Sequence, residues 1–97
     1  MKFVEQYYSL LPENTDAAFA LLSPQAQSAS GGKAGFDNFY RRFEDVDVED
    51  VRQTGDGTAE AIVVFDPRDG NTTRERYRFV VGDDGGRSIL ESFNQLG

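Results

Sequence analysis

Hydrophobic residues recur at helical spacing through the first part of the chain. Between residues 2 and 11 they stand three or four positions apart, which predicts an amphipathic helix that ends at Pro12. Asn14 is a residue type that caps helix N-termini, and Asp16 would lie in the first turn of the helix that it starts. The pattern therefore predicts two helices joined by a corner at the proline.

A third helix is predicted after a small, flexible segment. The second helix is expected to end at Ser23 and Pro24, which can also cap a brief turn as far as Gln27. Helical spacing returns over residues 33–43. One face of this helix carries four aromatic residues: Phe36, Phe39, Tyr40 and Phe43. That many rings require a broad apolar surface to pack against.

From Asp45 onward, apolar and polar residues alternate, which is typical of β-strands. The strand-like segments contain VDVED, TAEAIVVFD, TTRERYRFVV and RSILESF, and Gly- and Asp-rich turns separate them. Such turns predict an antiparallel meander of four strands. Three helices followed by four strands predict one α+β domain over residues 1–97, with the helices on one face of a curved sheet.

The segments YYSLLPENTDAAFALLSP, Gly-Gly, GFDNFYRRF and, at residues 74–79, RERYRF follow one another in a familiar order. In this order the chain resembles the NTF2-like superfamily. More narrowly, it resembles the small extracytoplasmic C-terminal domains of actinobacterial serine/threonine protein kinases and related membrane proteins, with Phe19 where their pattern has Trp. The resemblance implies a cone fold, a location outside the cytoplasm as part of a membrane protein, and an accessory role. It implies no reaction.

Composition removes several kinds of chemistry. The chain has 17 acidic and 10 basic residues, a net charge of −7, and neither Cys nor His. A negative surface repels nucleic acids, and no apolar run approaches the roughly 18 residues of a membrane span. The segment DPRDGN looks like a calcium loop, but aligning Gly70 with the loop glycine puts Phe65 and Arg76 at the terminal ligand positions. We therefore expect no nucleic-acid partner, no membrane insertion, no metal and no cofactor.

Glu75 is the carboxylate best placed for chemistry. Alternation puts it on the same face of its strand as Tyr77, toward the helices and near the wide end of the cone. A buried Glu needs a partner or a proton. It could be a structural carboxylate satisfied by Tyr7, Tyr8 or a backbone N–H, a group that orients a ligand, or a catalytic base.

The tyrosines are the other candidate ligand-binding residues. Tyr7 and Tyr8 are 100° apart on a helix, so we expect one to pack in the core and the other to line the mouth of the cone or donate its hydroxyl at the rim. For Tyr40 we favour a core position. With Glu75 and Tyr77, these three complete the candidate site.

Charged residues form two stripes on the outer face of the predicted sheet. The basic stripe is Arg74, Arg76 and Arg78, and the acidic stripe is Asp45, Asp47 and Glu49. Within one sheet, opposite charges on neighbouring strands can pair. The face is either a solvated, self-complementary surface or a homodimer interface, to which Ile62 and Val64 would add apolar area.

The number of aromatic side chains favours an accessory domain over an enzyme. Seven aromatic side chains are available to fill the cone, which predicts a pocket that is small or absent. An enzyme or a small-molecule binder needs a cavity of about 300 Å³ or more. The sequence therefore predicts a non-catalytic accessory or sensor domain that acts through protein contacts or weak ligand recognition, with no catalytic residue assigned. The alternative is a small lyase or isomerase that uses Glu75 with a tyrosine.

Overall fold

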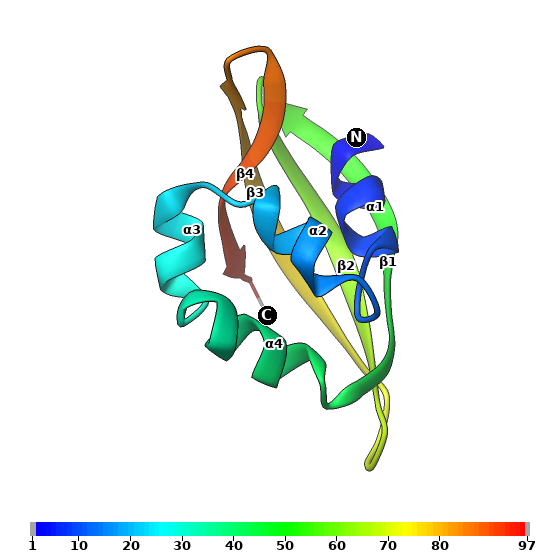
Figure 1. Ribbon diagram of the computed structural model, residues 1–97. Coiled ribbons are helices and arrows are strands. Elements are labelled where there is room, and N and C mark those ends of the chain that lie inside the picture. The colour runs from blue at the N-terminus through cyan, green and yellow to red at the C-terminus, as the bar shows by residue number, and fades with distance from the viewer. Residues whose placement is uncertain (1, 97) are drawn as a thin grey trace.

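The computed structural model describes residues 2–96, in which four short helices precede four strands (Figure 1). The helices are α1 (Lys2–Ser9), α2 (Thr15–Ala20), α3 (Pro24–Ala29) and α4 (Gly32–Tyr40). The strands are β1 (Phe43–Gly55), β2 (Thr58–Pro67), β3 (Thr73–Asp84) and β4 (Arg87–Gln95). The predicted α+β order is confirmed, but the described chain has four helices rather than three. None of these helices is long and apolar enough to cross a membrane.

The strands form one antiparallel sheet in the order β1-β2-β3-β4, which confirms the predicted meander. The register of β1 shifts between Glu49 and Arg52, where Asp50 has a φ of 52°. The register between β3 and β4 also shifts, between Val80 and Val81. Bulges of this kind bend a strand and increase its twist, so the sheet is curved where these shifts occur.

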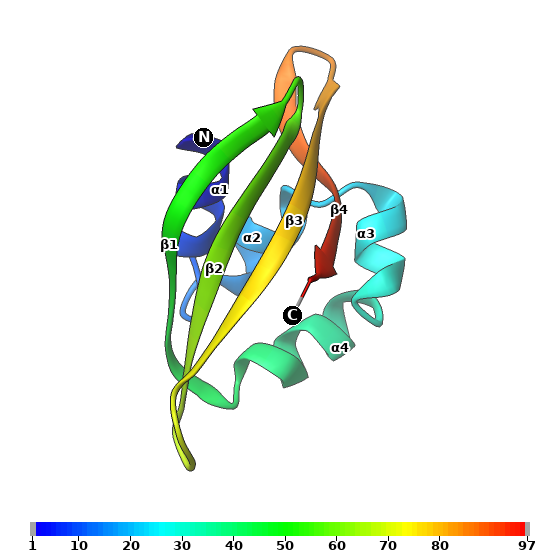
Figure 2. The ribbon, with the colours of Figure 1, turned by 180° about the vertical axis from the view of Figure 1, so that it is seen from behind.

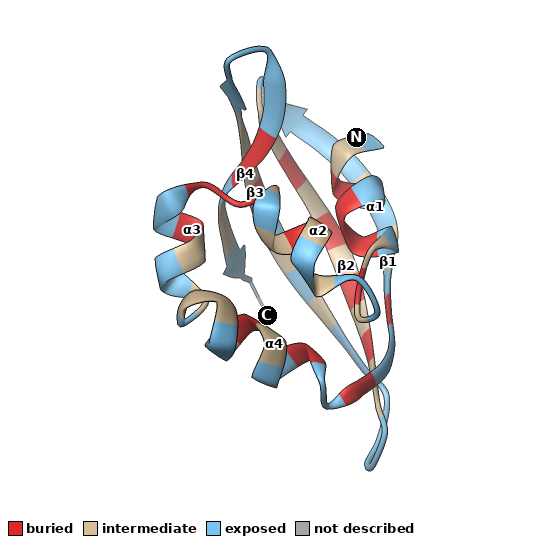
Figure 3. Cartoon of the chain, in the orientation of Figure 1, coloured by how far each residue is buried: buried red, intermediate tan, exposed pale blue. Residues whose placement is uncertain are grey.

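All four helices lie on one face of the sheet, and Figure 2 shows the opposite face uncovered by them. Burial alternates along β2 (Figure 3). Alternate residues of a strand share one face, so the buried residues lie on the side that the helices cover. Those residues are Ala59, Ala61, Val63 and Phe65. The core thus lies between the concave side of the sheet and the helices.

Two helix starts follow directly from their capping residues. The Asn14 side chain accepts a hydrogen bond from the Ala17 N–H at 3.2 Å, as predicted for the N-cap of α2. The Ser23 hydroxyl accepts from the Ala26 N–H at 3.1 Å, and Pro24 occupies the first turn. The predicted brief turn is therefore a separate helix, α3, because Ser followed by Pro is also a strong helix start.

Phe43 does not belong to the third predicted helix. Helix α4 ends at Tyr40, and Phe43 begins β1, paired with Pro67 of β2. The backbone N–H of Arg68 donates to the carbonyl of Arg42 at 2.9 Å. Beyond Tyr40 the backbone therefore bonds to the segment that follows β2 instead of continuing the helix. The spacing of the aromatic residues alone does not reveal this change.

The segment between α2 and α3 is attached to β4 by backbone hydrogen bonds. The Ser23 N–H donates to the Leu90 carbonyl at 2.9 Å, and the Leu90 N–H donates to the Leu21 carbonyl at 2.7 Å. The Ser23 hydroxyl also donates to the Glu91 carbonyl at 3.2 Å. The start of α3 is thus fixed at β4, while the end of α4 leads directly into β1. Helices α3 and α4 form an arc between these two anchored points (Figure 1).

Candidate functional site

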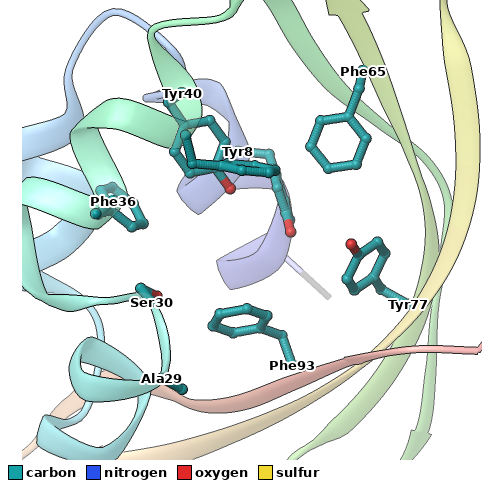
Figure 4. A pocket seen from close by; sticks show the side chains of 10 residues that line it. Tyr8, Ala29, Ser30, Phe36, Tyr40, Phe65, Tyr77 and Phe93 are labelled. Carbon is teal, nitrogen blue, oxygen red and sulfur yellow. The ribbon is translucent and has the colours of Figure 1, made fainter.

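A pocket of about 350 Å³ lies between the α3–α4 arc and the concave face of the sheet (Figure 4). We call it the aromatic pocket. Its lining comes from α1, α3, α4, β2, β3, β4 and the α3–α4 linker: Tyr8, Ala29, Ser30, Gly35, Phe36, Phe39, Tyr40, Phe65, Tyr77 and Phe93. The expectation of a small or absent pocket was wrong. Because both ends of the arc are anchored, α4 stands away from β3 and β4, and the rings line the space instead of filling it.

Five of the lining rings form a continuous curved wall. Along this wall the ring centroids are 4.9 Å apart for Phe36 and Tyr40, 4.9 Å for Tyr40 and Phe39, 5.9 Å for Phe39 and Phe65, and 6.4 Å for Phe65 and Tyr77. Neighbouring rings are inclined by 58° to 88°. These distances and angles are those of favourable edge-to-face aromatic pairs, so the wall stabilises itself.

A backbone contact holds the α4 side of the pocket close to α3. A Cβ atom placed on Gly35 would lie 2.7 Å from the carbonyl oxygen of Ser30. Only a glycine permits this approach without a shift of the backbone. Gly35 therefore sets how closely the two helices of the arc approach each other.

The polar groups that line the pocket are hydroxyls. In Figure 4 the hydroxyls of Tyr8 and Tyr77 point toward each other at one side of the space. Burial raises the pKa of Tyr8, and the neighbouring Tyr40, Tyr7 and Tyr77 add to the effect. Burial also raises the pKa of Tyr77, and the charge of Glu75 raises it further. These phenols are neutral at physiological pH and can donate or accept hydrogen bonds.

Tyr7 and Tyr8 are both buried, with exposed fractions of 2% and 4%, so the expectation that they could not both face the core was wrong. Their rings meet edge to face at 4.9 Å. Helix α1 lies in the concavity of the sheet and has protein on more than one side, which covers two directions 100° apart. Tyr8 combines the two roles that the sequence divided between them, because it packs on Phe79 and lines the pocket.

Tyr40 is buried, as favoured from the sequence, and it also lines the pocket. Burial is the main cause that raises its pKa, and Tyr77 contributes as well. The Tyr7 hydroxyl donates a hydrogen bond to Tyr40, which lowers the pKa of Tyr40. Burial raises the pKa of Tyr7 strongly, and its contacts with Tyr40 raise it further. The two hydroxyls are thus satisfied inside the core.

Glu75 lies on the predicted face of β3, opposite Val63 of β2, and is half-buried. The Thr73 hydroxyl donates to its carboxylate at 3.3 Å. Glu75 is not among the pocket-lining residues, although its charge acts on Tyr77, which is. Among residues 2–96, no group of three or more acidic side chains is arranged to hold a metal ion.

No protein-family model, curated protein or solved structure matches the chain.

On the uncovered sheet face, the two charged stripes flank β2. Arg74 of β3 forms an ion pair with Glu49 of β1 across the apolar side chains of β2. Arg76 and Arg78 are exposed, and Ile62 and Val64 are half-buried between the stripes. The stripes do share one face, and one predicted charge pair forms. An exposed pair of this kind contributes only about 0–1 kcal/mol to stability.

The sequence did not single out most of the pocket residues. Phe36, Phe39, Phe65 and Phe93 were expected to fill the core, and Ser30 and Gly35 had no assigned role. The presence of aromatic residues does not show whether their rings fill the interior or line a pocket in it. That depends on the backbone separation between α4 and the sheet. The signal that was available lies at Gly35, a glycine within an otherwise helical aromatic segment.

Proposed function

We propose that this chain is a non-catalytic recognition domain that binds a small, mainly apolar organic molecule in the aromatic pocket. The observation that carries the proposal is the pocket itself: about 350 Å³, lined by rings from α1, α4, β2, β3 and β4 and by tyrosine hydroxyls. Small-molecule sites are concave, mostly apolar and have a few polar groups that orient the ligand. The anchored α3–α4 arc supplies such a space ready-formed.

An NMR titration with indole tests this proposal, because ring currents shift the signals of residues near a bound aromatic molecule. Saturable shifts are expected for the lining residues. Ala29, an exposed lining residue of α3, allows the space to be filled by Ala29→Phe, which should abolish binding. Ala34→Phe is the matched control, since Ala34 is exposed on α4 and outside the lining. Equal binding by both variants, or none by the wild type, would refute the proposal.

Catalysis by Glu75 with a tyrosine is the alternative function. It would need the carboxylate to reach a bound substrate, as a general base must approach the proton that it removes. The charge of Glu75 acts on Tyr77, and this is the observation in its favour. Glu75→Gln with unchanged thermal stability but lost binding of neutral indole would support a direct role for the carboxylate. Unchanged indole binding would rule that role out.

The uncovered sheet face supports a second candidate function, homodimerisation. Its acidic stripe on β1 and basic stripe on β3 flank apolar β2, so a two-fold axis could place each stripe against the opposite one of a second copy. Ile62 and Val64 would then be covered. Sedimentation at low and high salt tests this, and a monomer under both conditions would rule it out.

We also infer, from the resemblance of the helical corner alone, that the domain is an NTF2-like cone and the extracytoplasmic sensor of a larger, kinase-type membrane protein. The antiparallel meander and the helices on its concave face are compatible with that fold. The full-length precursor provides the test: a kinase domain and a membrane span before this segment are expected, and a precursor with neither would contradict the inference.

A further inference from the structure

We propose that the aromatic pocket selects an organic cation with a methylated ammonium head group. This inference rests on the proposed function, since it names the chemical class of the ligand for the same site. Three observations carry it: the ring wall, the absence of basic side chains from the lining, and the position of Glu75.

The wall is suited to a cation because its surface is made of aromatic rings that remain neutral. The faces of Phe, Tyr and Trp rings carry negative charge density and attract a cation within about 6 Å, and cages of such rings recognise quaternary ammonium groups. Helix α4, β3 and β4 contribute rings to opposite sides of the space, including Phe36, Tyr77 and Phe93 (Figure 4). A compact cation between them would meet several rings at once.

The rings of this cluster already bind one cation. The guanidinium of Arg42 lies 4.9 Å from the ring centroid of Phe39 and 5.4 Å from that of Phe43. Arg42 is not a lining residue, so this contact leaves the pocket itself unoccupied by a basic group. Phe39, one of the lining rings, thus already lies within cation–π distance of a positive charge.

The charge around the pocket favours a cation over an anion. Its ten lining residues include no Lys or Arg. The carboxylate side chain of Glu75 lies on the same face of β3 as the lining residue Tyr77, two positions away. Burial raises the pKa of Tyr77, and the charge of Glu75 raises it further. The arginines of β3 alternate with these residues and therefore lie on the opposite face of the strand. With a net charge of −7, the whole chain adds an attractive field for cations.

A matched pair of probes separates charge from shape. Choline and 3,3-dimethylbutan-1-ol have nearly the same size, but the first has a trimethylammonium group where the second has a neutral tert-butyl group. We expect choline to bind to the lining residues more tightly, by about two- to thirty-fold, as cation–π attraction predicts. NMR titration of both compounds measures the ratio.

Two variants test whether the cation binds in the aromatic pocket. Phe93→Leu removes one ring and keeps an apolar side chain, and Glu75→Gln removes the nearby charge. Both should weaken choline binding several-fold and change binding of the neutral alcohol much less. Glu60→Gln is the matched control, because it changes the net charge equally on the opposite sheet face. It should leave the choline-to-alcohol ratio close to that of the wild type.

The outcomes distinguish this inference from the proposed function. Equal affinity for the two compounds, or a choline preference that survives both Glu75→Gln and Phe93→Leu, would overturn the cation inference. Binding of indole but of neither compound would overturn it as well and leave the proposed function standing. If indole, choline and the alcohol all fail to shift the lining residues, both proposals are wrong.

Discussion

The two ends of the helix layer bring similar aromatic side chains to the same concave face, but they pack differently. At the α1 end, Val4 and Tyr7 are almost completely buried, with exposed fractions of 1% and 2%. At the α4 end, Phe36 and Tyr40 are buried, but Phe39 is 39% exposed. Phe93 of β4 is half-buried, and all four rings line the aromatic pocket. The type of side chain is therefore not what decides between core and pocket.

The difference lies in how each helix is held. Helix α1 packs directly on β1, so its side chains interdigitate with those of the sheet. Helix α4 packs on α2 and α3, which are themselves attached to β4 through Leu21 and Ser23. Its distance from β3 and β4 is thus set by the arc and not by its own side chains. Rings on a helix held at a distance line a space that the same rings would otherwise fill.

The largest expected effect is a contrast in stability between the two ends. Tyr7→Ala should lower the free energy of unfolding by about 3–5 kcal/mol, because it leaves a cavity in a closed core. Phe93→Ala should cost well under half of that, since its ring already borders an open space. Urea unfolding of both variants measures the difference. Equal losses would mean that the α4 end is packed as tightly as the α1 end.

A smaller effect is expected from tightening the contact inside the arc. Gly35→Ala places a methyl group against the Ser30 carbonyl, which must move. We expect a loss of about 1–3 kcal/mol in unfolding free energy, as is typical of overpacking. Ala34→Gly, at the neighbouring exposed position, serves as a control for helix propensity alone and should cost about 1 kcal/mol or less. A neutral Gly35→Ala would show that α3 and α4 can separate freely.

Burial of Tyr7 at the closed α1 end should make stability depend on pH. The pKa of Tyr7 is raised above its ordinary value of 10.0, first by burial and then by Tyr40. Below about pH 9 the phenol is protonated in both the folded and unfolded states, so it adds no pH dependence. Above about pH 10 the unfolded chain loses this proton while the folded chain keeps it, and stability falls as pH rises.

One such group contributes a slope of about 1.4 kcal/mol per pH unit, until pH reaches the folded-state pKa. Tyr7→Phe should therefore make the decline in unfolding free energy above pH 10 shallower by about that amount, whatever it does to stability at neutral pH. Urea unfolding at a series of alkaline pH values checks the slope. An unchanged slope would mean that Tyr7 titrates alike in both states.

Sequence reasoning recovered the features that local chemistry determines. The proline corner, the Asn14 cap, the four alternating strands and the inward face of β3 all depend on spacing and turn residues. It did not recover α3 as a helix, although Ser23 and Pro24 are a local start signal for one. It did not recover Phe43 as the start of β1, because that pairing involves a partner distant in sequence. The start of α3 is held by Leu90, and the strand pairing at Phe43 involves Pro67.

The candidate site could be predicted only in part, because its shape also depends on contacts distant in sequence. Tyr8, Tyr40 and Tyr77 were named as candidate ligand-binding residues and do line the pocket, whereas Tyr7 lies in the closed core and Glu75 beside the lining. The phenylalanines of the wall were assigned to the core. Their hydrophobicity predicts that they face inward, but the width of the interior depends on the anchoring of the arc.

The most direct measurement is a set of intermolecular NOEs between bound indole and the rings of Phe36, Tyr77 and Phe93, which belong to three elements around the aromatic pocket. We expect NOEs to all three rings from one indole molecule, because the space lies between them. Direct NOEs joining Phe36 to Phe93 and to Tyr77, with no contact to indole, would show a collapsed interior and mean that the aromatic pocket does not exist.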